Sequence, residues 1–390
     1  MEFAEAENGM KGIMAMKSNP LLQIKTLGQS IWLDYIRRDL MESGGLRQLI
    51  EENGVRGITS NPAIFEKAII NGRDYEAGIR SMAVEGMAAE AIYENLCLHD
   101  VQMAADEFTP LYEKMHGGDG YVSLELNPHM AYDAKSTIEE ARRLWDALDR
   151  PNVFIKVPAT IEGLPAIEWL ISEGINVNVT LLFGLPHYRQ AAKRYITGIE
   201  TRLAQGKQVS QVASVASFFV SRIDTLVDQF LETIIAQGGN KASLAKRVVG
   251  QAAIASAKIA YQTYKEIFND ERFKKLAEKG ARTQRLLWAS TGTKNRDYSD
   301  VKYVEALIGT DTINTVPVAT LNAYRDHGIP KARLEDDVDK ALGIIELLPG
   351  LGIDIDAITQ QLEDEGVEKF NKPFDKVIER LAKTTSRFSC

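Results

Sequence analysis

Short apolar runs alternate with amphipathic helical segments along most of this chain. Eight of these runs are bounded by turn residues, as expected of buried strands. They cover residues 31–36, 57–61, 121–126, 153–157, 176–183, 212–220, 285–290 and 313–316. Helical periodicity fills most of the intervals between them, including 75–111, 136–148, 163–172, 185–204, 222–269 and 301–308.

Strands that alternate with helices pair in parallel through right-handed crossovers, and eight such units favour a closed barrel. The sequence therefore predicts an α/β fold, a (β/α)8 TIM barrel with helical insertions and a C-terminal helical extension. An open doubly wound sheet is the alternative. It is disfavoured because no GxGxxG follows the first strand and no GxxxxGK[ST] occurs in the chain.

The chain divides into three predicted parts. Residues 1–20 have mixed charge and lack the apolar core of a secretory signal, so we expect a flexible N-terminal extension. Residues 21–330 are expected to form the barrel, which carries the catalytic site. Residues 331–390 repeat apolar positions at helical spacing, which predicts a helical extension packed on the barrel.

The run VFIKV places Lys156 in the middle of an apolar strand. Lysine is rarely buried unless another group pairs with it or exploits it. Burial of an ammonium lowers its pKa, which supplies the neutral amine that attacks a carbonyl. Taken alone, a lysine that snorkels to solvent or pairs with one carboxylate is the more common case. The polar residues on the other strands favour the catalytic interpretation.

Residues two apart on a barrel strand share a face, and several polar residues share the inward face with Lys156. They lie near the C-terminal strand ends, where barrel enzymes place their active sites. Without a substrate to serve, charged groups inside a barrel would cost stability through desolvation. The set comprises Asp34, Asn61, Glu125, Asn178, Thr180, Ser217 and Ser290, with Arg222 just after the sixth strand.

These residues are the parts of a Schiff-base carbon–carbon lyase or transferase that needs no cofactor. Lys156 would attack a ketose carbonyl. Glu125 and Asp34 are the candidates for the acid that expels water and the base that accepts a hydroxyl proton. The planar cation of Arg222 suits a phosphate. The remaining candidates for holding substrate hydroxyls are Asn61, Asn178 and Ser217.

Seven segments occur in the order and strand context of one known family, from about Ile31 to Asn322. They are SIWLDYIRRDL, GITSNPAIFEKAI, YVSLELNPHMAYD, NVFIKVPAT, INVNVTLLF, ASFFVSRIDTLVD and LLWASTGTKN. The chain resembles the transaldolases, most closely the longer bacterial ones with an extended C-terminal part.

This resemblance implies transfer of a dihydroxyacetone unit in the pentose-phosphate pathway. Sedoheptulose 7-phosphate and glyceraldehyde 3-phosphate would give erythrose 4-phosphate and fructose 6-phosphate. By position, Lys156 matches the Schiff-base lysine, Asp34 the acid/base at the carbon–carbon bond, and Glu125 with Thr180 the pair that handles the catalytic water. The remaining matches are Asn61, Asn178 and Ser217 for the dihydroxyacetone unit, and Arg222 with Ser290 for the phosphate.

One position departs from the family pattern. Many transaldolases carry an arginine two residues after the phosphate-site serine, where this chain has Gly292. Lys294 follows and is the candidate that supplies the missing charge. The alternative interpretation is that Lys294 is a surface lysine exposed to solvent.

Composition narrows the class of partner. A net charge of −8 without a basic cluster argues against nucleic acid, although a local basic pocket still suits sugar phosphates. Two cysteines and five histidines show no metal-binding spacing, so neither a metal nor a cofactor is expected. No apolar run reaches the roughly 18–20 residues that span a bilayer. We expect a cytoplasmic protein, as a monomer or a homodimer.

Three other functions compete with this interpretation, and the residues argue against two of them. An aldolase that releases dihydroxyacetone would use the same side chains. A catalytically inactive, sugar-phosphate-binding regulator would be expected to lose Lys156 or a carboxylate, and this chain keeps them. The stretch after Ile313 is too short for a second, fused enzyme.

Overall fold

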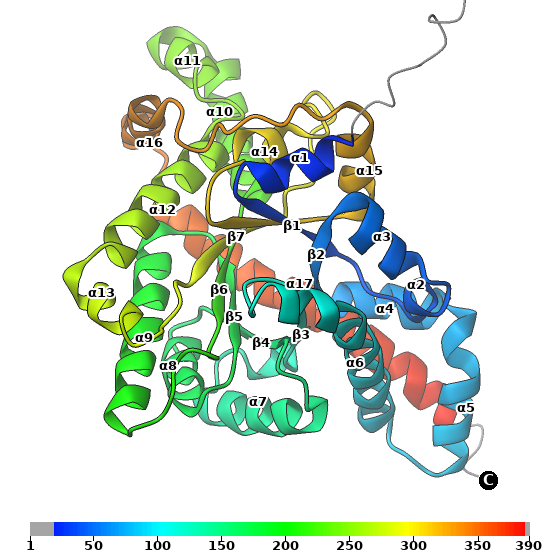
Figure 1. The fold of residues 1–390 in the computed structure, drawn as a ribbon. Helices are drawn as coiled ribbons and strands as arrows, with labels where there is room; N and C mark the ends of the chain where they lie inside the picture. Colours follow the sequence, from blue (N-terminus) through cyan, green and yellow to red (C-terminus); the bar gives the residue numbers. More distant parts are fainter. Residues whose placement is uncertain (1–18, 387–390) are drawn as a thin grey trace, which may run out of the picture.

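The computed structural model describes residues 19–386. Eight parallel strands form one closed barrel, in which each strand pairs with the next and the last pairs with the first (Figure 1). The predicted (β/α)8 fold is therefore confirmed. The strands are β1 Gln29–Asp34, β2 Val55–Thr59, β3 Tyr121–Glu125, β4 Val153–Pro158, β5 Val177–Leu182, β6 Ser214–Phe219, β7 Arg285–Ala289 and β8 Thr312–Val316.

The eight predicted strands are all present, with shifted ends. The first begins and ends two residues earlier than predicted, so Asp34 is its last residue. Moving the ends of a strand does not change which of its residues share a face, because side chains alternate with a period of two. The inward positions inferred for Asp34 and Lys156 are therefore unaffected.

Helices surround the barrel and fill the intervals between strands (Figure 1). The predicted segment 75–111 is interrupted near Gly86, whose φ of +81° suits a chain reversal. Segment 222–269 contains three helices, as its length suggested. The helices are α1 Pro20–Thr26, α2 Arg38–Glu42, α3 Gly45–Asn53, α4 Pro62–Asn71, α5 Glu76–Val84, α6 Ala89–Lys114, α7 Ala134–Leu148, α8 Gly163–Glu173, α9 Leu185–Ala204, α10 Ser221–Gln237, α11 Gly239–Lys246, α12 Ala252–Phe268, α13 Glu271–Ala277, α14 Lys302–Ala306, α15 Val318–His327, α16 Val338–Leu351 and α17 Ile355–Thr385, with 3-10 turns η1 Arg73–Tyr75 and η2 Pro128–Met130.

Aromatic side chains fill part of the barrel interior. Trp32, Tyr121 and Phe154 stack on one another, with 4.3 Å between the ring centroids of Tyr121 and Phe154. The Trp32 indole N–H donates to the buried Asp119 carboxylate at 3.0 Å. Two of these aromatic residues, Trp32 and Phe154, lie two positions before the charged residues of their strands. The interior is thus a packed core that supports the polar groups nearer the C-terminal strand ends.

The last helix, α17, crosses the barrel and brings a distant part of the chain to its mouth (Figure 1). It packs against α4, α6 and α10. Lys369 and Phe370, near its middle, line the cavity described below. Within residues 19–386, no helix is both long and apolar enough to cross a membrane. Residues 1–18 of the predicted N-terminal extension lie outside the described part.

Candidate active site

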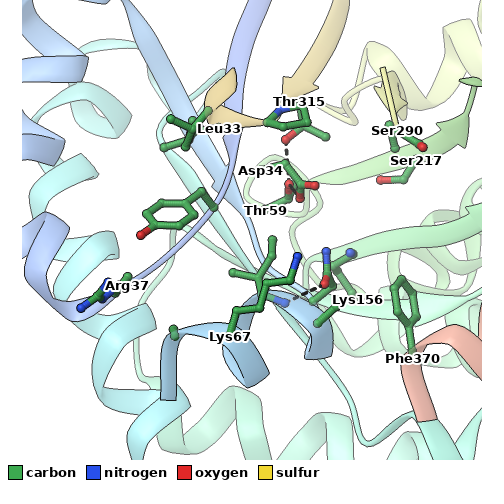
Figure 2. Close-up of a pocket in the computed structure, with 18 of the residues that line it drawn as sticks. Leu33, Asp34, Arg37, Thr59, Lys67, Lys156, Ser217, Ser290, Thr315 and Phe370 are labelled. Carbon is green, nitrogen blue, oxygen red and sulfur yellow. Dashed lines mark hydrogen bonds between the residues drawn. The ribbon is translucent and has the colours of Figure 1, made fainter. Parts of the chain in front are cut away.

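A cavity of about 850 Å³ opens at the C-terminal ends of the strands. Strand ends form its floor, and α17 contributes Phe370 to its wall. Figure 2 shows Asp34, Thr59 and Thr315 grouped on one side and Ser217 and Ser290 on another. Seven of the ten predicted site residues line this cavity: Asp34, Asn61, Lys156, Ser217, Arg222, Ser290 and Lys294.

Lys156 and Glu125 form a buried ion pair at the base of the cavity. The ammonium Nζ donates to Glu125 Oε2 at 3.3 Å and to the Ser60 carbonyl oxygen at 3.1 Å. Their side chains are only 5% and 4% exposed. The register of β3 and β4 pairs the two residues directly, which holds them together. Burial raises the pKa of Glu125, and the positive charge of Lys156 opposes that rise.

The second carboxylate, Asp34, ends β1 at the cavity wall. The Thr59 hydroxyl donates to Asp34 Oδ1 at 2.7 Å and lies 2.6 Å from the Thr315 hydroxyl (Figure 2). Burial raises the pKa of Asp34, while the charge of Lys156 and the bond from Thr59 lower it. The Thr59 hydroxyl, itself bonded to Thr315, holds the carboxylate in place. Burial favours proton exchange closer to neutral pH than for an ordinary aspartate.

A chain of hydrogen bonds connects β3, β5 and β6 beneath the cavity. Asn178 donates its amide N–H to the Ser123 hydroxyl at 3.1 Å, and its oxygen accepts from the Ser217 hydroxyl at 2.6 Å. Asn178 pairs in register with Lys156, which places it next to the ammonium. Thr180 is fully buried on the same strand, and its hydroxyl has no partner among the described residues.

Asn61 has a structural function in addition to its place in the cavity wall. Its side-chain oxygen accepts from the backbone N–H of Ile64 at 3.1 Å and so caps α4. The cap fixes the side chain at the mouth of β2. The amide N–H groups are the donors that remain for a ligand.

One side of the cavity is positively charged. Arg222 lies in the first turn of α10, and Lys294 and Lys67 line the same wall. Within residues 19–386, none of these three has a carboxylate within 4.0 Å. Burial, and then the charge of Arg222, lower the pKa of Lys294. Cations without carboxylate partners in a cavity are suited to an anion.

Ser290 stands beside this positive wall in a strained conformation. Its φ is +54°, in the left-handed region that a serine rarely adopts, and its hydroxyl lies 3.2 Å from that of Ser221. Strain of this kind is often stored at functional sites. The turn directs the chain from β7 toward Lys294.

The structure thus brings all ten predicted residues to one end of the barrel, with three of them outside the cavity wall. Glu125 is bonded to Lys156, and Asn178 is bonded to Ser217, so each contacts a residue of the cavity wall. Thr180 is two residues beyond Asn178 on β5. The sequence reasoning missed Lys67 and the α17 residues Lys369 and Phe370. The helical spacing of the EKAII segment gave no sign that Lys67 faces the mouth.

The fold and this site are those of an α/β-barrel enzyme. Residues 31–381 match the family model described as transaldolase/fructose-6-phosphate aldolase. "Transaldolase 2" of Nostoc sp. strain PCC 7120 is 49% identical over 94% of this chain and 97% of its own length. "Transaldolase" of Trichodesmium erythraeum is 47% identical over 96% and 100%. "Transaldolase" of Mycobacterium tuberculosis is 42% identical over 94% and 97%.

This chain therefore belongs to the transaldolase/fructose-6-phosphate aldolase family. The family predicted from the motifs is confirmed. The relatives also support the predicted transaldolase activity and the transferase class, and the family implies sugar phosphates as substrates. In the described part of the chain, no group of three His, Cys, Asp or Glu side chains could hold a metal ion.

Replacing Lys156 with Met leaves Glu125 buried without its opposite charge. We expect Lys156→Met to lower the free energy of unfolding by about 3 kcal/mol at neutral pH. The pKa of Glu125 then rises further in the folded state, so the folded protein binds the proton more tightly than the unfolded one. The loss in free energy of unfolding relative to the parent therefore becomes smaller as the pH is lowered from neutral. Urea unfolding of both proteins over a pH series measures this loss.

The double variant Lys156→Met/Glu125→Gln is the matched control for this prediction. It removes both charges, so we expect it to lose less stability than Lys156→Met at neutral pH and to depend less on pH. Equal stability of the single variant and the parent at every pH would show that the pair is not held as described.

Proposed function

We propose that this enzyme transfers a dihydroxyacetone unit between sugar phosphates through a Schiff base on Lys156. Sedoheptulose 7-phosphate donates the unit, glyceraldehyde 3-phosphate accepts it, and erythrose 4-phosphate and fructose 6-phosphate are the products. The observation that carries the proposal is the buried Lys156–Glu125 pair at the base of a cavity with a positive wall. An amine in this position is suited to attack a ketose carbonyl.

Glu125 handles protons and water during imine formation. Its carboxyl oxygen is 3.3 Å from Nζ, close enough to exchange a proton with the amine and with the carbinolamine hydroxyl. The carbonyl oxygen leaves as water once this hydroxyl is protonated. Thr180 has a buried hydroxyl without a partner among residues 19–386, which supports a role in holding that water.

Asp34 acts at the carbon–carbon bond. After the imine forms, cleavage between C3 and C4 requires a base that takes the proton of the C4 hydroxyl. The C3–C4 electron pair moves to C3, where the protonated imine stabilises it, and the aldehyde leaves. Asp34 returns the proton to the new hydroxyl when the acceptor aldehyde is attacked. Its fixed position between Thr59 and the cavity supports this assignment.

The remaining polar residues hold the two ends of the sugar. Asn61, Asn178 and Ser217 bind the hydroxyls of the dihydroxyacetone unit. Arg222, Ser290 and Lys294 bind the phosphate, with Lys294 in place of the arginine absent at Gly292. The lack of an ion-pair partner for Arg222 and Lys294 within residues 19–386 supports this assignment.

We place the catalytic domain at residues 21–330 and the helical extension at 331–390. The contact of α17 with the cavity supports a function for the extension in covering the site. The cytoplasmic location and the state of monomer or homodimer stay predictions. An aldolase that releases free dihydroxyacetone is the second candidate, because the family description covers both activities.

Borohydride reduction tests the covalent step directly. With fructose 6-phosphate present, we expect irreversible inactivation and a reduced dihydroxyacetone adduct on the peptide that contains Lys156, read by mass spectrometry. Lys156→Met is the control and should show no adduct and no transfer. An active enzyme without an adduct on this peptide would refute the proposal. Release of dihydroxyacetone as fast as transfer to erythrose 4-phosphate would favour the aldolase.

The pH dependence of turnover tests Asp34 as the base. Activity should fall as the pH drops through the pKa of Asp34, because the carboxylate is the active form. Thr59→Val removes a hydrogen bond that lowers this pKa, so the acidic limb of kcat should move up by about one pH unit. Thr315→Val is the matched control, since its hydroxyl contacts Thr59 and not Asp34. No shift, or a shift to lower pH, would contradict the assignment.

Lys294→Met tests the positive wall. We expect kcat/KM for fructose 6-phosphate to fall about tenfold or more, because a charge-assisted hydrogen bond is lost. The value for unphosphorylated fructose should change little. Lys369→Met is the matched control, since this lysine lines the same cavity but pairs with Glu365 at 2.7 Å. Equal losses for both sugars would show that Lys294 does not bind the phosphate.

A further inference from the structure

A second cavity, of about 430 Å³, has Glu125 in its wall. It opens between α6 and α7 beside the end of β3, and no residue of its wall also lines the first cavity. Lys156 belongs to the wall of the first cavity and Glu125 to the wall of the second, with 3.3 Å between their charged atoms. The ion pair is therefore the partition between the two.

This second cavity contains polar atoms suited to holding water. Glu125 Oε1 and Glu140 Oε2 are buried and have no hydrogen-bond partner among the described residues. The other oxygen of Glu140 accepts from the backbone N–H of Asn127 at 3.3 Å, which fixes this carboxyl in the wall. Tyr93 lines the same space, and its phenol lies within electrostatic range of both carboxyls. A space this large with unpartnered polar atoms is a place where water binds.

Charge makes the second cavity unsuitable for sugar phosphates. Among the described residues that line it, Arg143 is the one basic side chain, and it is paired with Glu94. Anionic substrates are repelled from a wall of this sign, whereas neutral water is not. The acidic residues of the wall are Glu90, Glu94, Glu125, Glu139 and Glu140.

The proposed Schiff-base reaction needs a route for water at this point. When an amine and a ketone form an imine, the carbonyl oxygen leaves as one water molecule, carrying one proton from the nitrogen and one that Glu125 delivers. Hydrolysis of the imine takes up one water molecule in reverse. On the side of the first cavity, the Phe370 ring lies 6.0 Å from Nζ, and bound sugar would occupy the space in front of it.

We infer that the second cavity is the passage by which this water leaves and re-enters while sugar occupies the first cavity. The inference rests on the Schiff-base function proposed above. Substrate and water then use different openings, which are separated by Glu125. Ser136 on α7 lines the passage, and Glu139 stands exposed at its rim.

Exchange of oxygen-18 tests the passage. Fructose 6-phosphate is incubated with enzyme in H₂¹⁸O without acceptor, and the label at C2 is read by mass spectrometry after reduction. The enzyme-free rate is subtracted, and the result is divided by the rate of transfer to erythrose 4-phosphate. Ser136→Trp should lower this ratio several-fold relative to Ser136→Ala. The trapped water is returned to the sugar, so transfer itself should stay near the parent rate.

The outcomes separate the passage from the function on which it rests. Equal ratios for folded Ser136→Trp and Ser136→Ala would overturn the passage. They would show that the water leaves through the first cavity, which binds the substrate. If circular dichroism shows that Ser136→Trp is unfolded, Glu139→Trp against Glu139→Ala decides in the same way. Absence of a borohydride adduct on Lys156 in the parent would instead refute the Schiff base. An adduct with unequal ratios supports both.

Discussion

The buried ion pair between Lys156 and Glu125 is the interaction on which the rest of the site depends. Removing two charges from water costs several kcal/mol, which the pair offsets only through close contact and further hydrogen bonds. The direct pairing of the two residues across β3 and β4 provides the contact, and the Ser60 carbonyl oxygen provides another acceptor for the ammonium. A slip of one residue in either strand would turn one charge into the helical layer. The register between β3 and β4 must therefore be kept both for the stability of the barrel and for the chemistry of the site.

The interior around this pair explains how polar groups are tolerated so deep in the barrel. The Asn178 side chain is satisfied at both ends by Ser123 and Ser217, so β3, β5 and β6 are connected without leaving an amide unpaired. Asp34 is held by Thr59 in a similar way. Satisfied networks of this kind make side chains rigid, which positions them for a substrate before it arrives. Among residues 19–386 the Thr180 hydroxyl has no partner, which leaves it available for the water of the proposed reaction.

Most of the fold could be predicted from the sequence, because the information is local. Each strand is a short apolar run, and the two-residue alternation shows that Asp34 and Lys156 point inward even when the strand ends are misplaced. The site could be predicted less completely. Lys67 faces the mouth because of how α4 packs, and Phe370 arrives on a helix more than 200 residues after Lys156 in the chain. The capping bond of Asn61 and the cavity behind Glu125 also arise from tertiary packing. Contacts that arise from tertiary packing cannot be predicted from the periodicity of the sequence.

The distribution of charge connects these observations. The chain has a net charge of −8, yet the wall near Arg222 and Lys294 is positive and the wall behind Glu125 is negative. Inside a barrel the low dielectric preserves such local fields, whereas between exposed groups salt would screen them. An anionic sugar is therefore attracted to one face of the ion pair and repelled from the other. The same α17 contributes Phe370 to the first wall and Phe374, one helical turn later, to the second. A single helix thus lines both cavities, and the substrate cavity and the proposed water passage approach the ion pair along walls of opposite charge.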